Sequence, residues 1–88
     1  MNESEALGAI RRVARSGLLI FTTHAERRMK QRRVSVRDVR HALRNAATVQ
    51  RSAPDQASDW TTTGPDALGD ELTVGVRLRG GIIVVTVY

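Results

Sequence analysis

The residues best suited to chemistry in this chain lie in one short segment that contains one of its two histidines. The segment reads Thr22-Thr23-His24-Ala25-Glu26-Arg27-Arg28-Met29-Lys30-Gln31-Arg32-Arg33. A histidine can gain or lose a proton near neutral pH, and arginine side chains bind phosphate oxygens through paired hydrogen bonds. The two threonines also predict a helix start, where backbone N–H groups attract anions. The segment is therefore suited to holding a phosphate and moving a proton beside it.

Cleavage of RNA without a metal ion is one reaction that these residue types could carry. It needs a base for the 2′-hydroxyl, an acid for the leaving oxygen and cations for the developing negative charge. His24 is the candidate base or acid, and Arg28 lies one helical turn along the same face. Arg77 is a candidate for stabilising charge, and Tyr88 for donating a proton or packing against a base. The structural alternative for His24 is a side chain that caps its helix or packs against a sheet.

Two arginines of this segment should point towards the sheet rather than into solvent. On a helical wheel Arg28 and Arg32 lie between His24 and the narrow apolar stripe of the helix. That position suits either a buried salt bridge or a ligand site. We expect a structural role for Arg32, with Asp59 or Asp66 as its partner, and both roles stay open for Arg28.

The charge of the chain points to an anionic partner. Fourteen lysines and arginines stand against nine aspartates and glutamates, for a net charge of +5. Eight cations lie between His24 and Arg44, whereas the segment from Pro54 to Glu71 holds five acids and no cation. Nucleic acid is the first expected partner and an acidic protein the second; the simpler interpretation is a solvated basic helical surface. The candidate nucleic-acid contacts are Arg27, Lys30, Arg33, Arg37, Arg40, Arg44 and Arg79.

The same composition excludes several classes of site. With no cysteine there are no disulfides or thiolate metal ligands, and two histidines without a paired carboxylate motif predict no metal site. No glycine-rich phosphate loop is present, so no cofactor is expected, and aromatic residues at 3% argue against binding single strands by serial base stacking. The acidic N-terminus and short apolar runs predict neither a secretory signal nor a membrane span, so we expect a cytoplasmic protein. His41, on a flank with Arg37 and Arg44, is expected to be merely solvated.

Hydrophobic spacing and start signals predict helices in the first half of the chain. The first helix is expected from Ser4 to Arg15, followed by a short buried strand from Leu18 to Thr22. The second is expected to begin at Thr23, with the glutamate three residues later completing a capping box. A third follows Ser35, which forms a similar box with Asp38.

Strands and turns are predicted for the second half, and a terminal hairpin is its clearest feature. A two-residue turn at Gly80-Gly81 would pair Arg79 with Ile82 and Gly75 with Thr86. The face shared with Gly75 would then carry Thr73, Arg77, Arg79, Thr86 and Tyr88. The opposite, core face would carry Leu72, Val74, Val76, Leu78, Ile83, Val85 and Val87. The other expected segments are strand 48–51, loop 54–59, strand 60–63 and turn 64–66, with Trp60 as a sheet anchor.

This order of elements and three sequence segments resemble a known group of small bacterial proteins. The segments are Thr22 to Arg32, Ser35-Val36-Arg37-Asp38-Val39 and Val85-Thr86-Val87-Tyr88. They are similar to the T-x-H-A-x-x-R-M-x-x-R, S-x-x-D-V and V-T-V-Y patterns of an uncharacterised bacterial domain family in the RelE-like toxin superfamily, which includes the MqsR and BrnT families. The resemblance covers about Leu18 to Tyr88. It implies a single α+β domain, residues 1–88, with a RelE/MqsR-like fold: N-terminal helices packed on a C-terminal antiparallel β-sheet.

The resemblance implies a fold more strongly than an activity, because the superfamily includes ribonucleases, gyrase poisons and proteins without a shown activity. The leading hypothesis is a toxin–antitoxin protein that acts on RNA as a metal-independent ribonuclease and is neutralised by a cognate protein. The alternative is a non-catalytic immunity or regulatory protein that binds a nuclease toxin through the acidic segment from Pro54 to Glu71. A third possibility is a nucleic-acid-binding protein without catalysis, whose affinity would fall steeply with salt.

Overall fold

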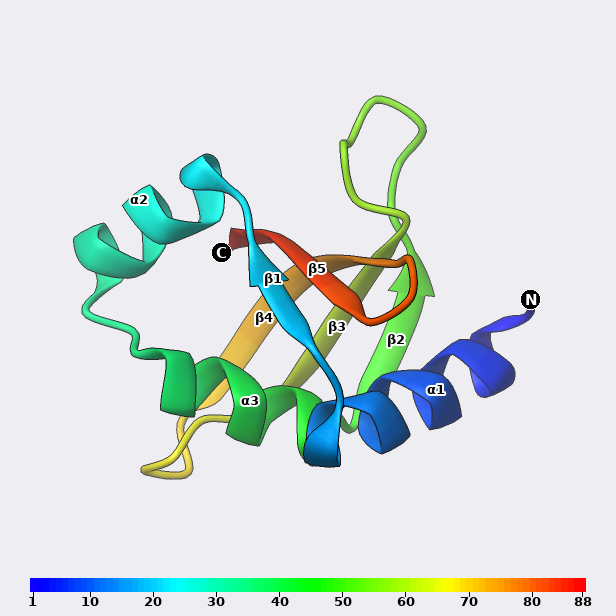
Figure 1. Ribbon diagram of the computed structural model, residues 1–88, viewed down its shortest axis with the longest axis horizontal. Helices are drawn as coiled ribbons and strands as arrows, with labels where there is room; N and C mark the ends of the chain where they lie inside the picture. Colours follow the sequence, from blue (N-terminus) through cyan, green and yellow to red (C-terminus); the bar gives the residue numbers. More distant parts are fainter.

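The computed structural model describes all 88 residues and has the predicted α+β class (Figure 1). Five strands form one sheet in the order β1-β5-β4-β3-β2, in which β1 is parallel to β5 and the other neighbours are antiparallel. None of the helices is long and apolar enough to cross a membrane. The elements are α1 (Glu3–Ser16), β1 (Leu19–Phe21), α2 (Thr23–Arg32), α3 (Val36–Arg44), β2 (Thr48–Arg51), β3 (Trp60–Pro65), β4 (Glu71–Leu78) and β5 (Ile82–Val87).

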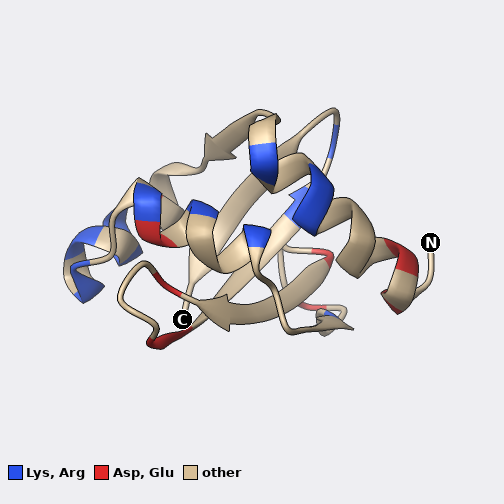
Figure 2. Ribbon diagram, turned by 90° about the horizontal axis from the view of Figure 1, so that it is seen from below, with Lys and Arg blue, Asp and Glu red and all other residues tan.

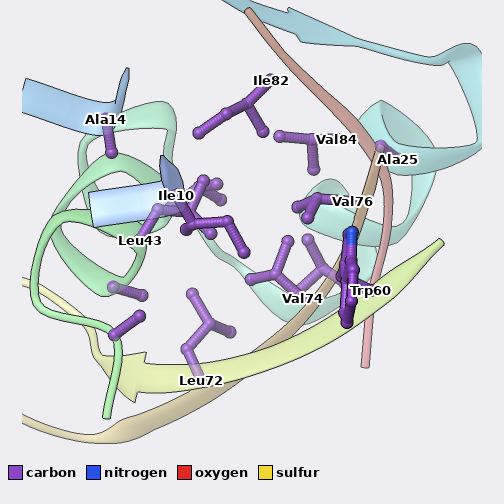
Figure 3. Packing of buried hydrophobic residues seen from close by; sticks show 14 of the residues in the cluster. Ile10, Ala14, Ala25, Leu43, Trp60, Leu72, Val74, Val76, Ile82 and Val84 are labelled. Atoms are coloured by element: carbon purple, nitrogen blue, oxygen red, sulfur yellow. The ribbon is translucent and has the colours of Figure 1, made fainter. Parts of the chain in front are cut away.

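The helices lie in two positions relative to the sheet. Helices α1 and α3 contact each other and pack on one face of it, while α2 packs along β5 (Figure 1). Ile10 of α1 and Leu43 of α3 are fully buried against valines of β4 and β5 in one core (Figure 3). Burial of each such side chain stabilises a fold by about 1.5–3 kcal/mol, so this layer supplies most of the stability of a small domain. Trp60 is 5% exposed in the same core, as expected of a sheet anchor.

The helix starts follow the sequence signals, with one correction. The Ser35–Asp38 capping box is confirmed, and α1 begins with a second box between Asn2 and Glu5. Helix α2 begins at Thr23 as predicted, but its cap is Thr22, whose hydroxyl accepts a hydrogen bond from the Ala25 N–H at 3.0 Å. The prediction of Thr23 as the cap was wrong because both threonines have the right chemistry, and only the backbone direction decides between them.

The register of the terminal hairpin differs from the prediction over half its length. The turn has three residues, Arg79-Gly80-Gly81, so that Leu78 rather than Arg79 pairs with Ile82. A bulge at Val85 then restores the predicted pairing of Gly75 with Thr86. A register shift of one residue moves the side chains of a strand to the opposite face of the sheet. The extra residue of a bulge reverses this shift for the residues that follow it.

The change of register alters which residues of β5 form the core. Ile82 and Val84 are fully buried, whereas Ile83 and Val85, predicted as core, are only partly buried. The run from Ile82 to Val85 is apolar throughout, so its sequence cannot say which side chains face the helices. The face predicted from β4 is confirmed for Leu72, Val74 and Val76.

Two further expectations are corrected at strand ends. Strand β1 is not buried: it is an edge strand paired only with β5, and Ile20 is 44% exposed. Strand β3 continues through Gly64 and Pro65, so the predicted turn at 64–66 is displaced. The turn begins at Asp66, whose carboxylate accepts hydrogen bonds from Leu68 N and Asp70 N at 2.9 Å each.

Helix α3 lies so close to β3 that Gly64 has no room for a side chain. A Cβ there would collide with the backbone carbonyl oxygen of Ala42 and lie 3.0 Å from Ala46 Cα. We expect Gly64→Ala to lower the free energy of unfolding by about 2 kcal/mol or more through overpacking. Gly8→Ala, where a Cβ meets nothing within 4 Å, should instead stabilise α1 by about 0.5–1 kcal/mol. Urea denaturation measures both, and equal effects would contradict the packing described.

Candidate functional site

The outer edge of β5 is closed by residues at the start of α2. Strand β1 ends at Phe21, so beyond this point β5 has no neighbouring strand on that side. Thr22 donates from its backbone N–H to Val84 O at 3.1 Å and from its hydroxyl to Val85 O at 2.9 Å. Arg28 Nε donates to Val87 O at 3.1 Å. Thr22 and Arg28, from the segment Thr22 to Arg32, therefore pair with backbone carbonyl groups of β5. These carbonyl groups would otherwise have no hydrogen-bond partner.

The same motif brings His24 to the open face of the sheet. His24 Nε2 lies 3.2 Å from Thr86 Oγ1, and the tautomer decides which of the two atoms donates. The His24 side chain is exposed, while Thr86 is 8% exposed and pairs with Gly75 on β4. Ala25 and Met29, on the other flank of α2, are buried in the core. Helix α2 thus has one face for packing and one that presents His24 and Arg28 at the end of β5.

The loop between β2 and β3 folds over the open face beside Thr86. Ser58 is 4% exposed, and its hydroxyl would lie 2.9 Å from a Cβ on Gly75. Only a glycine leaves room for this contact. Tyr88 Oη donates a hydrogen bond to Gln56 Oε1 at 3.0 Å, which ties the end of β5 to the same loop.

These contacts enclose a hollow of about 280 Å³, called the His24 hollow below. It presents an imidazole, a guanidinium, a hydroxyl and a phenol, which are groups that can bind a phosphate and transfer a proton. Its lining residues are His24, Arg28, Gln56, Ala57, Val85, Thr86 and Tyr88.

Three of the four predicted catalytic residues line the His24 hollow, and Arg77 does not. Arg77 lies two residues along β4 from Gly75, about 7 Å away at the rise of a strand. Its Nε is buried without a hydrogen-bond partner. Of the additional lining residues, Thr86 had been expected on the polar face, whereas nothing in the sequence indicated Gln56, because its position depends on the path of a loop.

The predicted nucleic-acid contacts are spread over several surfaces (Figure 2). Arg27 and Lys30 are exposed on α2, and Arg33 ends that helix in a left-handed conformation, with φ of 56°. Arg37 and Arg44 are exposed on α3, which packs on the opposite face of the sheet from Ser58 and Gly75. The basic block is therefore contiguous in sequence but divided in space.

Arg40 and Arg79 have identifiable partners, whereas Arg32 has none. Arg40 Nη1 donates to Ala14 O at 2.9 Å and to Gly17 O at 3.3 Å, which caps the end of α1. Arg79 forms an ion pair with Asp59 at 3.0 Å. The salt bridge expected for Arg32 is absent, because Arg32 is exposed and Asp59 is taken by Arg79.

One carboxylate is electrostatically distinct and lies at the start of α3. The backbone N–H and hydroxyl of Ser35 each donate to Asp38 Oδ2 at 3.0 Å, and Ala67 N donates to Oδ1 at 3.1 Å. The bond from the Ser35 backbone is the main cause that lowers the pKa of Asp38, and burial opposes it. The Ser35 hydroxyl, the Ala67 N–H and the charge of Arg37 also lower this pKa. Asp38 thus ties the β3–β4 loop to α3.

Thr22 should be one of the most important polar side chains for stability, since it both caps α2 and closes the edge of β5. Thr22→Val removes both hydrogen bonds at nearly constant volume and is expected to cost about 2 kcal/mol of unfolding free energy. Thr23→Val is the matched control, because the Thr23 side chain is exposed and makes neither contact. Equal denaturation midpoints for the two variants would contradict the role assigned to Thr22.

The lowered pKa of Asp38 predicts a pH dependence with a definite sign. Because the folded-state pKa lies below the unfolded one, the ionised carboxylate adds stability above about pH 4, and this is lost as the pH falls further. Asp38→Asn should therefore be less stable than wild type at neutral pH, with a difference that shrinks in acid. Asp70→Asn, at an exposed carboxylate, is the control in thermal denaturation across this pH range. A difference that does not change with pH would contradict the assignment.

Comparison with known proteins gives a family and no named relative. A search of curated proteins and a search of solved structures found no match. A model of a domain of unknown function, DUF4258, matches residues 21–88, which include the whole of α2, α3 and the strands from β2 to β5. The two segments that line the His24 hollow from α2 and β5, Thr22 to Arg32 and Val85 to Tyr88, both lie in the matched range. The chain therefore belongs to the DUF4258 family.

Proposed function

We propose that this protein acts on RNA as a metal-independent ribonuclease of toxin–antitoxin type, with the His24 hollow as its active site. The observation that carries this proposal is the convergence of three chemically suitable groups on one hollow. His24 and Arg28 reach it from α2, and Tyr88 reaches it from the end of β5. An exposed imidazole beside a guanidinium and a phenol is not required by the packing of the core.

The proposed reaction is attack of the RNA 2′-oxygen on the adjacent phosphorus. His24 accepts the proton of the 2′-hydroxyl; when Nε2 donates to Thr86, Nδ1 is unprotonated and can do so. The new P–O bond forms as the bond to the 5′-oxygen breaks, which yields a 2′,3′-cyclic phosphate. Tyr88 gives its proton to the departing 5′-oxygen, which replaces Gln56 as the acceptor.

Arg28 would bind the non-bridging phosphate oxygens during this step. Its Nε is used by Val87 O, and one Nη1 proton by Gln31 Oε1 at 3.4 Å. A guanidinium has five N–H donors, so the rest of this side chain can meet a phosphate. The contact with Val87 would fix its direction without consuming its charge.

The arrangement of helices on a sheet, together with the quoted motifs, also supports membership of the RelE-like toxin superfamily. On this proposal the protein works in the cytoplasm and is neutralised by a cognate protein. Because one fold hosts many functions, the chemistry of the hollow, rather than the fold, carries the proposed activity.

A non-catalytic immunity or regulatory protein is the second candidate, and one observation favours it. Thr22 and Arg28 already have a structural role at the edge of β5. The acidic surface first suggested for it is divided, however. Asp55 and Asp59 precede β3, whereas Asp66, Asp70 and Glu71 follow it, at the opposite end of the strand (Figure 1).

The test is incubation of the purified protein with defined RNA transcripts in the presence of a chelator. We expect cleavage to a 2′,3′-cyclic phosphate, and a loss of about a hundredfold or more in rate for His24→Asn. Tyr88→Phe should slow the reaction while leaving RNA affinity unchanged.

Arg12→Gln, an exposed cation on α1, is the matched control for charge loss and for contaminating nucleases in the preparation. Cleavage that is equal in His24→Asn and Arg12→Gln would refute an active site at His24. A folded wild-type protein that leaves all transcripts intact would favour the binding protein.

A further inference from the structure

A second cluster of cations lies on the outer face of α3, away from the His24 hollow. Four residues at spacings of three and four share this face, and the buried Val39, Ala42 and Leu43 lie on the opposite side of the helix. They line a hollow of about 280 Å³, called the α3 hollow below, whose one apolar lining residue is Ala67. The four residues are Arg37, Arg40, His41 and Arg44, of which the three arginines are cationic.

Two of these side chains are fixed by neighbouring elements. Arg40 is held by the carbonyl groups at the end of α1. His41 Nδ1 lies 2.8 Å from Pro65 O. Because a carbonyl only accepts, Nδ1 carries the proton, and Nε2 is free for another partner. Arg40 and His41 are therefore held in place by hydrogen bonds, while Arg37 and Arg44 are exposed.

No carboxylate forms an ion pair with this cluster, although the charge of Asp38 attracts the neighbouring Arg37. The one ion pair in the structure joins Arg79 and Asp59. Asp38, next to Arg37 in the sequence, and Asp66, next to Ala67, accept hydrogen bonds from backbone N–H groups. Repulsion among the cations therefore acts against the fold.

The helix dipole accounts for part of the cluster only. His41 and Arg44 lie in the last turn of α3, where cations are favoured. Arg37 lies in the first turn, where a cation is disfavoured, and none of the hydrogen bonds of the structure involves its side chain. Asp38 attracts this charge, but its oxygens are hydrogen-bonded to Ser35 and Ala67, so the Arg37 guanidinium is available to an external anion.

We propose that the α3 hollow binds a phosphate group. Planar guanidinium groups match the oxygens of a phosphate in pairs, and His41 Nε2 adds a donor when the ring is protonated. An acidic peptide fits less well, because a peptide also needs apolar contacts and Ala67 alone provides them. The site lies on the opposite side of the sheet from the His24 hollow, and does not depend on the activity proposed there.

The phosphate can belong to a nucleic-acid backbone or to a small soluble molecule, and two probes distinguish these sources. Inorganic phosphate tests the soluble form, and a short single-stranded oligothymidylate, which has no 2′-hydroxyl to react, tests the backbone form. The protein has two histidines, so the ring signals in a proton NMR spectrum can be assigned with His24→Asn. We expect the ring signals of His41 to shift on binding. Any shift of the His24 signals reports phosphate in the His24 hollow, so the two sites are measured separately.

The matched variants are Arg37→Gln/Arg44→Gln and Arg12→Gln/Arg32→Gln. Each removes two exposed arginines that make none of the hydrogen bonds of the fold, so both should remain folded. The first should weaken binding of the responding probe about tenfold or more, since it loses two charge-assisted contacts. Arg12→Gln/Arg32→Gln should change the affinity for the same probe by less than about twofold. The affinity for oligothymidylate should also fall steeply as the salt concentration rises.

Saturation by inorganic phosphate would support a site for a soluble phosphate, and saturation by oligothymidylate alone a site for a nucleic-acid backbone. Equal weakening by the two double variants would overturn the proposal, because net charge alone would then explain binding. It would also be overturned if neither probe shifts His41, or if an oligoglutamate peptide binds there more tightly than both probes. RNA cleavage is not measured in this experiment, so its outcome is separate from that of the proposed ribonuclease.

Discussion

The closure of the outer edge of β5 by the start of α2 is the interaction on which most of this structure depends. A three-residue β1 cannot pair the whole of β5, and unpaired backbone groups at this edge would invite association with other strands. Thr22 and Arg28 donate to the exposed carbonyl groups instead. The same contacts fix α2 against the sheet, bury Ala25 and Met29, and bring His24 to Thr86. Stability and the candidate site therefore share one set of hydrogen bonds.

The bulge in β5 is the second constraint, because it changes which side chains of the strand face the core. Before it, Ile82 and Val84 face the helices and complete the core. After it, Thr86 stands on the open face opposite Gly75, while Val87 returns to the core. Bulges often re-aim side chains beside functional sites. Here one extra residue allows an apolar strand to end with a hydroxyl at the His24 hollow.

The distribution of charge follows from the same architecture. The basic block is continuous in sequence, yet α2 and α3 project its cations on different sides, and the acidic segment is divided by β3 in the same way. Arg40 donates to carbonyl groups and Arg79 forms an ion pair with Asp59, whereas the exposed side chains of Arg37 and Arg44 have neither a hydrogen bond nor an ion pair. The net charge of the chain therefore does not indicate what either hollow can bind. This depends on the hydrogen-bond and ion-pair partners of the side chains that line it.

The amino-acid sequence was sufficient to predict the α+β class, the three helices, the Ser35–Asp38 cap and the core face of β4. These features depend on contacts between residues close in the chain, or on strict alternation, and both are visible in a sequence. The sequence also identified His24, Arg28 and Tyr88 as candidate site residues, because the chemistry of a side chain can be read without knowing the fold. Tertiary structure alone decided the cap at Thr22, the register of β5, the role of Gln56 and the separation of the α3 hollow from the His24 hollow. Each of these depends on contacts between distant segments, whose energies no local pattern records.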